Sequence, residues 1–443
     1  MTWRESDGPT ALKGVGAPNV ESSVSGARES RLTIAYVPLR YVPAPLDGSE
    51  YYLKWLAESV RELCNPVIIT TNGLTRSRVF LPPRILKDSR ISHIGGIPVE
   101  RYEIARKRVV LASMIGSPLN AIFAKPLPNL GALGEYLDLW SSGLYAPGIE
   151  MRLMQVDADI VHTAGVSHPT NWLAAKACDQ SGKRLVVTPF VNMALLPQGF
   201  PSWIFKVFAR SSAIIAATNS EASFLISIGV PSDKVHTIPP GINLDEWRDS
   251  NGMAMRRELG LDSDVFVVLL PRKSIHKGCL DTLDALIRVG IKMGKKLAVL
   301  VLGDGKIGGY DQRVSRLRGL GVRVFELGYT SDQRKRNAFG ACDVVVQPSR
   351  AEAFGLVYLE AWACSKPVIG SRFPAVADVI QNDTNGFLVT HGNVGEIFGT
   401  LMLLASNRSV GERLGRNGNE TLQERYDVKL VAKKLVAIYE SLC

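Results

Sequence analysis

The sequence predicts an α/β protein built from two doubly wound, mostly parallel sheets. Two observations lead to this prediction. The chain has 443 residues, which exceeds the roughly 250 to 300 residues at which a single hydrophobic core stops growing. From Arg31 onward, short apolar runs alternate with amphipathic helical runs, and this alternation is typical of parallel strands covered by helices on both faces. Two such domains are therefore expected.

The first series of elements begins at Arg31. A helix is predicted at 50–63, where Leu53, Leu56, Val60 and Leu63 recur at helical spacing. Residues 72–150 show weak periodicity and several prolines, so only loops and helices without fixed bounds are expected there. Buried strands are predicted at RLTIAYVPL (31–39), PVIITT (66–71), DIVHTA (159–164), RLVVTPF (184–190) and AIIAATNS (213–220).

A second series follows the segment IPPGINLDEWRDSNG (238–252), whose Pro, Gly and Asp content predicts a crossing between domains. Helices are expected at 279–290, at 312–321 and around Glu360. The final run 427–442 places Leu430, Val431, Leu435 and Ile438 on one apolar stripe that must be buried. Strands are predicted at VFVVLLP (265–271), KLAVLVLG (296–303), VRVFELG (322–328), DVVVQPS (343–349), PVIGS (367–371) and GFLVT (386–390).

Composition narrows the class of protein. A formal charge of +10 favours anionic partners without choosing among them. The six cysteines lack paired spacing, which favours a reduced cytosolic setting over a disulfide framework or zinc site. Residues 1–30 are rich in Gly, Ser and Pro and are interpreted as a disordered extension rather than a secretion signal. The longest apolar region, from Val109, falls short of the ~20 residues that span a bilayer.

Glu360 raises the main chemical question, because it lies in an otherwise apolar helical run and a buried carboxylate needs a partner. One possibility is a neighbouring basic residue. The other is a ligand: the backbone N–H groups of Gly355, Leu356 and Val357 begin the helix and favour a phosphate. Glu360, roughly 7 Å further along the axis, would then accept hydrogen bonds from hydroxyls beside that phosphate.

A basic loop follows another strand of the same predicted sheet. In LLPRKSIHKG, Arg272 and Lys277 are spaced so that both cations can converge on a diphosphate, although a solvated basic loop is the alternative. Because both loops follow strands of one parallel sheet, they should open at the same edge. The sequence therefore predicts a phosphate site there.

These motifs together resemble the GT-B retaining glycosyltransferases of glycosyltransferase family 4, which use sugar nucleotides. The resemblance covers about residues 31–443. It rests on EAFGLVYLE, PRKSIHKG, LVLGDG, GYTSD and NGFLV in the second half, and on PLDGSEYYLKWLAE, ADIVH and SIGVPSDKVHTIPPGINLDEW in the first.

The resemblance implies an organisation and a set of site residues. The domains would be the extension 1–30, an acceptor-side domain 31–248, a sugar-nucleotide domain 249–426, and a C-terminal helix 427–443 that returns to the first domain. Glu352 would be the catalytic residue that contacts donor-sugar hydroxyls. The donor-binding residues would be Arg272 and Lys277 at the diphosphate, Glu360 at the ribose, Phe354, Gly355 and Leu356 near the sugar and phosphates, Gly48 where the other domain approaches, and Tyr329 and Thr330 near the base.

The implied activity is transfer of a sugar, as by a hexosyltransferase, from a nucleotide-diphosphate sugar to a glycan, lipid-linked or small-molecule acceptor. The sugar nucleotide is a co-substrate, no other cofactor is implied, and no nucleic acid is expected as partner. No metal is required, because Arg272, Lys277 and a helix N-terminus can neutralise the leaving diphosphate.

One departure supports an alternative. The family often carries a His after the VVT strand, where this chain has Pro189, Phe190, Val191 and Asn192. The alternative is a non-catalytic sugar-nucleotide-binding regulatory subunit with the same fold. A sugar-nucleotide epimerase is a further candidate, but the order of the motifs favours transfer.

Three other patterns resemble a dinucleotide-binding motif or metal sites, but the sequence supports each of them less well. GDGKIG (303–308) with Glu326 satisfies a dinucleotide fingerprint, but it follows the second strand of its series rather than the first. The Asp157/Asp159 and Asp262/Asp264 pairs precede strands and are interpreted as turns. His162 and His168 lack a third ligand and are interpreted as structural or cleft-lining residues.

A cluster of basic residues suggests that the protein acts at a membrane surface. Arg101, Arg106, Lys107 and Arg108 lead into the apolar segment 109–123, which would suit peripheral contact with the inner face of the membrane and a lipid-linked acceptor. The alternative is a solvated helix end in a cytoplasmic protein.

Overall fold

The computed structural model describes residues 31–44, 46–74, 84–87, 90–105, 139, 144–193 and 200–443. The predicted extension 1–30 lies outside these residues, as do Arg106, Lys107, Arg108 and the apolar segment that follows them. Arg101 is described and does not belong to a surface cluster. It is buried and donates hydrogen bonds to Ser92 Oγ (2.7 Å) and the Val42 carbonyl (2.7 Å).

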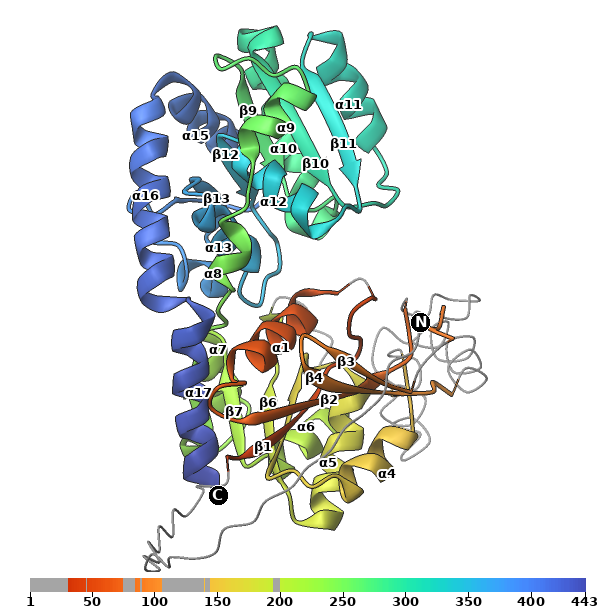
Figure 1. The fold of residues 1–443 in the computed structure, drawn as a ribbon. Helices are drawn as coiled ribbons and strands as arrows, with labels where there is room; N and C mark the ends of the chain where they lie inside the picture. The colour runs from red at the N-terminus through yellow and green to blue at the C-terminus, as the bar shows by residue number, and fades with distance from the viewer. Residues whose placement is uncertain are drawn as a thin grey trace, which may run out of the picture. The chain divides into compact units, whose positions relative to one another are not determined.

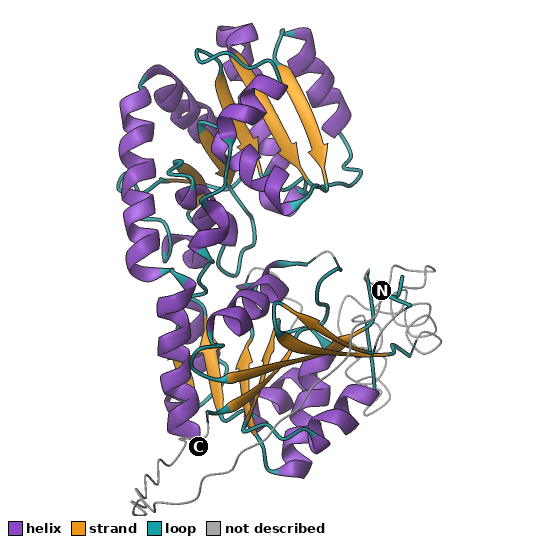
Figure 2. Cartoon of the chain, viewed as in Figure 1, coloured by secondary structure: helices purple, strands orange, loops and turns teal. Residues whose placement is uncertain are grey.

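The first sheet has eight strands in the order β3-β4-β2-β1-β5-β6-β7-β8, all parallel except β3. Helices cover both faces of it, as Figures 1 and 2 show. Its strands are β1 (Thr33–Val37), β2 (Asn65–Thr71), β3 (Ile91–Ile94), β4 (Ile97–Tyr102), β5 (Ile160–Ala164), β6 (Arg184–Thr188), β7 (Ala213–Ala216) and β8 (Val235–Thr237). The helices of this half are α1 (Gly48–Ser59), α4 (Gly148–Gln155), α5 (Pro169–Ser181), α6 (Ser202–Arg210) and α7 (Asn219–Ser227).

The hairpin β3–β4 contradicts the expectation that 72–150 holds only loops and helices. Its two-residue turn is Gly95-Gly96, with φ of +56° and +77°, and glycine adopts this left-handed region without steric cost. The residues of β4 alternate between buried and half-buried along the strand. Two alternating runs around a Gly-Gly pair are a recognisable hairpin signal, which the prolines of this region obscured.

The second sheet has six parallel strands in the order β11-β10-β9-β12-β13-β14. Its strands are β9 (Phe266–Leu270), β10 (Leu297–Leu302), β11 (Arg323–Gly328), β12 (Val344–Gln347), β13 (Val368–Ser371) and β14 (Phe387–Val389). The helices from the crossing onward are α8 (Leu244–Trp247), α9 (Gly252–Glu258), α10 (Cys279–Met293), α11 (Tyr310–Gly319), α12 (Asp332–Ala341), α13 (Leu356–Ala363), α14 (Pro374–Ala377), α15 (Val394–Ser406), α16 (Arg408–Arg425) and α17 (Val428–Leu442). The two parallel-sheet α/β halves that the sequence predicted are therefore present.

Strand order explains where a ligand can bind. In the first sheet, β1 lies between β2 and β5, and in the second, β9 lies between β10 and β12, so the order reverses at β1 and at β9. Open parallel sheets bind ligands outside the carboxyl ends of the strands at such a reversal. The loops after β9 and β12 are the ones that carry the two motifs found in the sequence.

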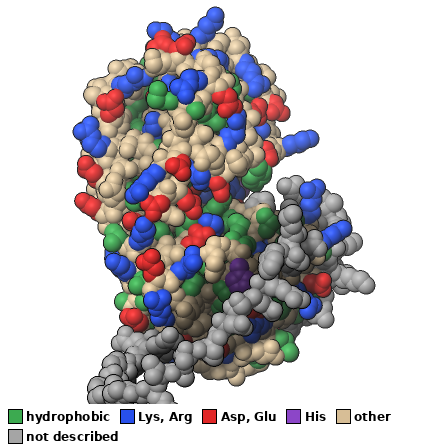
Figure 3. All heavy atoms as spheres, in the orientation of Figure 1, with side chains coloured by type: hydrophobic (Ala, Val, Ile, Leu, Met, Phe, Trp, Pro, Cys, Tyr) green, Lys and Arg blue, Asp and Glu red, His purple; other side chains and the backbone are tan. Residues whose placement is uncertain are grey.

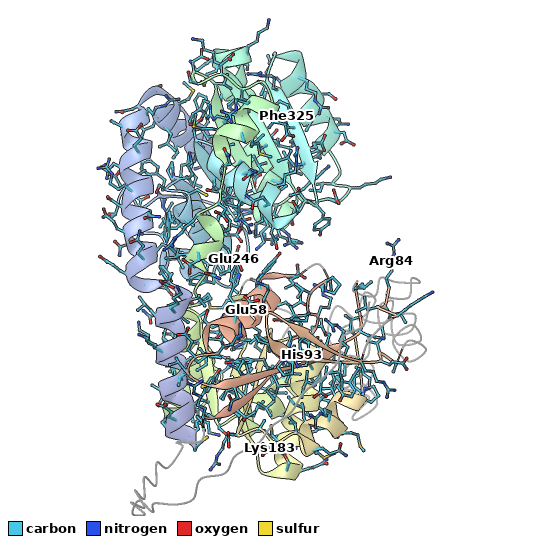
Figure 4. The ribbon with its side chains drawn as sticks, viewed as in Figure 1. Glu58, Arg84, His93, Lys183, Glu246 and Phe325 are labelled. Carbon is cyan, nitrogen blue, oxygen red and sulfur yellow. The ribbon has the colours of Figure 1, made fainter. Side chains whose placement is uncertain are left out.

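The crossing segment is tied to α1. Lys54 Nζ lies 3.0 Å from Glu58 Oε2 and 3.3 Å from Glu246 Oε1, so it bridges α1 and α8; both glutamates are labelled in Figure 4. Trp55 Nε1 donates a hydrogen bond to Glu246 Oε2 (3.2 Å). These contacts fix α1, whose first residue is Gly48.

Helix α17 packs on the first sheet, beside α1 (Figure 1). Val431 and Leu435 are buried there, whereas Leu430 is 39% exposed and does not belong to the buried stripe. Tyr439 Oη lies 2.6 Å from His162 Nδ1. Burial lowers the pKa of His162 to about 3, so this histidine is a neutral core residue, which agrees with its predicted structural role.

The charge of the chain is spread rather than gathered on the face shown in Figure 3. Basic and acidic side chains are interspersed there over the described residues. No helix within the described ranges combines the length and apolar composition needed to cross a membrane.

Candidate functional site

A cavity of about 1150 Å³ opens at the loops that follow strands of both sheets. From the first sheet it is lined by residues after β1, β5 and β6, and from the second by residues after β9, β10, β11 and β12. All the residues that the sequence assigned to the site line it: Gly48, Arg272, Lys277, Tyr329, Thr330, Glu352, Phe354, Gly355, Leu356 and Glu360. The structure therefore brings the predicted set together, although their roles remain predictions.

Three donors converge on one oxygen of Glu352. One of its oxygens, Oε2, lies 2.8 Å from Lys277 Nζ and accepts hydrogen bonds from Gln347 Nε2 (3.1 Å) and Ser349 Oγ (3.3 Å). The residue is only 9% exposed. Three donors on one oxygen leave the other oxygen available to a ligand. Gln347 and Ser349 were missed in the sequence, although Gln347 ends β12 and Ser349 stands in the loop that follows it.

Glu360 has a protein partner and an unsatisfied oxygen. Its Oε1 lies 2.5 Å from Lys335 Nζ of α12, while Oε2 is buried without a hydrogen-bond partner. Burial raises the pKa of Glu360, and the charge of Lys335 opposes that rise. The two possibilities left open by the sequence therefore coexist: a basic neighbour holds one oxygen, and the other is free for a ligand hydroxyl. Sequence offers no signal for Lys335, since the pair depends on how α12 packs on α13.

Replacing Lys335 with Met should destabilise the protein by about 3 kcal/mol at neutral pH, because a buried carboxylate loses its partner. Glu360 has a raised folded pKa, so its ionised form is costly in the native state and its contribution to stability falls as pH rises. The loss on substitution should therefore be smaller at about pH 4 than at about pH 8. Urea unfolding at both pH values measures it, with Lys335→Arg as control; an equal loss at both would contradict the pairing.

The start of α13 depends on a glycine. Gly355 has φ of +97° and caps the helix, which begins at Leu356, one residue later than expected. A Cβ at this position would lie 2.3 Å from Tyr358 Cε2. Both the left-handed backbone and the space require glycine. The first amides of α13 are those that lack intrahelical acceptors, and the residues that carry them line the cavity.

Arg272 is the second predicted cation. Its side chain is 50% exposed, and Nη2 lies 3.3 Å from Asp47 Oδ1. Asp47 Oδ2 also pairs with Arg40 Nη2 (3.0 Å), and Arg40 in turn forms two hydrogen bonds to buried Glu50. No pattern in the sequence indicated this acidic contact, because Asp47 and Arg272 are 225 positions apart. A diphosphate that engages Arg272 would compete with Asp47 for the guanidinium group.

Three further predicted site residues, Tyr329, Thr330 and Gly48, also line the cavity. Tyr329 is 72% exposed, and Thr330 is half-buried. A Cβ on Gly48 would lie 3.5 Å from Leu356 Cδ1, an ordinary contact. The structure alone therefore does not require glycine at position 48, and the need would have to come from a ligand.

The competing motifs have structural explanations. Gly303 lines the cavity, but α11 begins only at Tyr310, so the glycines do not open a helix as a dinucleotide fingerprint requires. Glu326 pairs with Lys273 (3.1 Å). Asp159 accepts a hydrogen bond from the Thr33 amide. Within the described ranges, no three His, Cys, Asp or Glu side chains gather as metal ligands.

Two glycosyltransferase families match parts of this chain. The family described as Glycosyl transferases group 1 matches residues 254–421, which contain the β9 and β12 loops. The family described as Glycosyltransferase Family 4 matches residues 122–246. The chain is therefore similar to glycosyltransferases of these two families in both of its halves.

Several curated relatives of this chain are named D-inositol 3-phosphate glycosyltransferases. One from Xylanimonas cellulosilytica is 33% identical over 254 residues, which are 52% of this chain and 60% of the relative. Another, from Catenulispora acidiphila, is 30% identical over 285 residues, 58% of this chain and 65% of the relative. The matched region thus spans less than two thirds of each of these relatives.

Solved structures support the fold. Anabaena HepE, crystallised with UDP and glucose, superposes with a TM-score of 0.67 at 20% identity and covers 93% of this chain and 100% of its own. Sucrose-phosphate synthase from Thermosynechococcus elongatus gives a TM-score of 0.68 at 18% identity, over 93% of this chain and 99% of its own. These identities are low, so the similarity shows the GT-B fold alone.

Proposed function

We propose that this protein is a retaining glycosyltransferase that moves a sugar from a nucleotide-diphosphate sugar to an acceptor hydroxyl. The observation that carries the proposal is the ion pair between Lys277 and Glu352, 2.8 Å apart, in a cavity that also holds Arg272 and the first turn of α13. Cations and helix amides are suited to a diphosphate. The nearby carboxylate is suited to sugar hydroxyls or to positive charge at the anomeric carbon.

Each residue has a defined task in this scheme. The anomeric C–O bond to the diphosphate breaks while a bond to the acceptor oxygen forms, and the proton of the acceptor hydroxyl passes to an oxygen of the leaving diphosphate. Arg272, Lys277 and the α13 amides stabilise the charge that develops on the leaving diphosphate. The unpartnered Oε2 of Glu360 accepts a hydrogen bond from a ribose hydroxyl. Glu352, fixed by Lys277, contacts the transferred sugar at its remaining oxygen.

The donor can be found by thermal stabilisation. UDP-, GDP- and ADP-linked sugars are each added, and the melting temperature is recorded. A ligand at about 100 times its Kd stabilises the folded state by about 2.7 kcal/mol, so the correct nucleotide should raise the melting temperature clearly above the others. Failure of all three nucleotide classes to stabilise the protein would contradict the proposed donor site.

The acceptor is tested with the stabilising donor. Candidates include D-inositol 3-phosphate, after which the curated relatives are named, together with a glycan and a lipid-linked sugar. Release of the nucleotide diphosphate with formation of a glycosylated acceptor supports transfer. Tight nucleotide binding without any sugar released or transferred would favour the non-catalytic regulatory subunit instead.

A further inference from the structure

The cavity has two chemically different walls. Among the described residues that line it, every Lys and Arg belongs to the second half of the chain: Arg272, Lys273, Lys277 and Lys335. In the first half, Asp47 is the only Asp, Glu, Lys or Arg among the described lining residues. The described part of the first-half wall therefore contributes no basic side chain to a ligand.

The four cations of the second-half wall already have partners or assigned tasks. Lys273 Nζ lies 3.1 Å from Glu326 Oε2, and Lys335 Nζ lies 2.5 Å from Glu360 Oε1. The other two cations are those assigned above to the donor diphosphate. A second phosphate, carried by the acceptor, would thus find no unengaged Lys or Arg among the described lining residues. Because an unpaired buried charge is costly, the cavity disfavours a phosphorylated acceptor once the donor is bound.

The first-half wall is largely apolar. Val42 and Leu46 line the cavity from the loop after β1, Val166 from the loop after β5, and Ile204 from α6. The first three side chains are half-buried, so part of each apolar surface stays open. Covering apolar surface with an apolar group is favourable, because it removes that surface from water. This wall is therefore suited to an apolar part of a ligand.

Hydrogen bonds hold the apolar wall in place. The buried side chain of Arg101 donates to the Val42 carbonyl (2.7 Å). At the other end of the same loop, Arg40 Nη2 lies 3.0 Å from Asp47 Oδ2. The Val166 amide donates to a backbone carbonyl that follows β6 (2.6 Å). A wall that is already ordered loses little conformational freedom when a ligand binds, so this surface is preformed for its ligand.

We propose that the acceptor is a neutral compound with an apolar group beside the hydroxyl that receives the sugar, and that Val42, Leu46 and Val166 bind this apolar group. The inference rests on the proposed function, because it presumes that the donor diphosphate occupies the cations of the second-half wall. It narrows the class of acceptor and disfavours D-inositol 3-phosphate, one of the candidates above.

The test uses the stabilising donor with two matched pairs of acceptors. Octyl and methyl β-D-glucoside differ in their apolar group alone, and D-inositol 3-phosphate differs from myo-inositol in its phosphate alone. Below the concentration at which it forms micelles, octyl glucoside should have a KM about tenfold lower than methyl glucoside, because the wall covers part of its chain. D-inositol 3-phosphate should be used no better than myo-inositol.

Phenyl β-D-glucoside then identifies the kind of apolar group. A KM as low as that of octyl glucoside indicates an aromatic acceptor, and a KM like that of methyl glucoside indicates an alkyl chain. Either result supports an apolar acceptor, provided that octyl glucoside is preferred over methyl glucoside.

A substitution in the wall tests the residues. Leu46→Ser should raise the KM for octyl glucoside by about fivefold, since less apolar surface covers the chain. It should leave the KM for methyl glucoside and the Kd of the nucleotide diphosphate unchanged, and the unchanged Kd shows that the variant is folded. Leu403→Ser is the matched control, because Leu403 is 45% exposed on α15 and does not line the cavity. It should change none of these values.

The inference is overturned if octyl and methyl glucoside are used equally well, if D-inositol 3-phosphate is preferred over myo-inositol, or if Leu46→Ser keeps the full preference for octyl glucoside. Should water alone accept the sugar, octyl glucoside is expected to slow hydrolysis of the donor more than methyl glucoside does, and equal effects would also overturn it. If no nucleotide binds the wild type, the proposed function itself fails, which is a distinguishable result.

Discussion

Replacing Lys277 with Ala should weaken the binding of the nucleotide diphosphate by more than tenfold. A charge-assisted hydrogen bond contributes about 1.5 to 3 kcal/mol, and about 1.4 kcal/mol corresponds to a factor of ten. The substitution also leaves Glu352, whose side chain is 11% exposed, without its cation, so an unbalanced carboxylate would then face the incoming diphosphate. Arg272→Ala should have a smaller effect, since Arg272 is half exposed and solvent screens its charge. Isothermal titration measures both.

Lys176→Ala provides the control for Lys277→Ala. Lys176 Nζ lies 2.7 Å from Glu150 Oε1, with side-chain exposures of 32% and 16%, so the pair is similar in geometry but outside the cavity. Its loss should leave nucleotide affinity unchanged. If Lys277→Ala also binds the nucleotide with wild-type affinity, the assignment of the diphosphate site is wrong.

Replacing Glu352 with Gln should lower kcat by on the order of 100-fold, the size seen when one electrostatic contact to a transition state is removed. The Gln side chain keeps the shape of Glu352 but has no negative charge. It therefore cannot stabilise the positive charge that develops at the anomeric carbon when the bond between the sugar and the diphosphate breaks. Affinity for the nucleotide diphosphate should be retained, because Lys277 is then released from Glu352 and remains available. Steady-state kinetics together with nucleotide titration separate the two effects.

Glu150→Gln is the matched control for this substitution and should leave kcat unchanged. A Glu352→Gln variant with near wild-type kcat would remove Glu352 from the catalytic step. A variant that loses nucleotide affinity but keeps its kcat at saturating donor would assign Glu352 to binding alone.

Much of the fold could be predicted because buried parallel strands are continuous apolar runs. The runs around β1, β9, β10 and β12 were located from sequence, and their order places the motif loops at the reversals of strand order. The edge hairpin β3–β4 was missed, since its half-buried strands have no such run. The exposed position of Leu430 shows the limit of helical periodicity, which locates an apolar face but not its edges.

The site was predictable where one loop carries the chemistry and unpredictable where distant segments meet. Glu352 and Glu360 stand on one strand–loop–helix unit, so their spacing was informative. The contacts of Lys335 with Glu360 and of Arg272 with Asp47 join residues 25 and 225 positions apart. The buried carboxylate of Glu221 accepts hydrogen bonds from the Val191 and Ala217 amides. This contact was likewise missed, because a Thr-x-x-Glu pattern predicts a helix start and gives no sign that the carboxylate will hold another loop.

The anomeric configuration of the product shows whether sugar transfer occurs and whether it retains the configuration of the donor. Proton NMR can follow the reaction of the stabilising α-linked nucleotide sugar with its acceptor, or with water, at times too early for the released sugar to change its anomeric form. We expect nucleotide diphosphate to appear together with an α-configured product, and Glu352→Gln to slow the appearance of both. A β-configured first product would contradict retention, and unchanged donor in the presence of every acceptor tested would contradict sugar transfer.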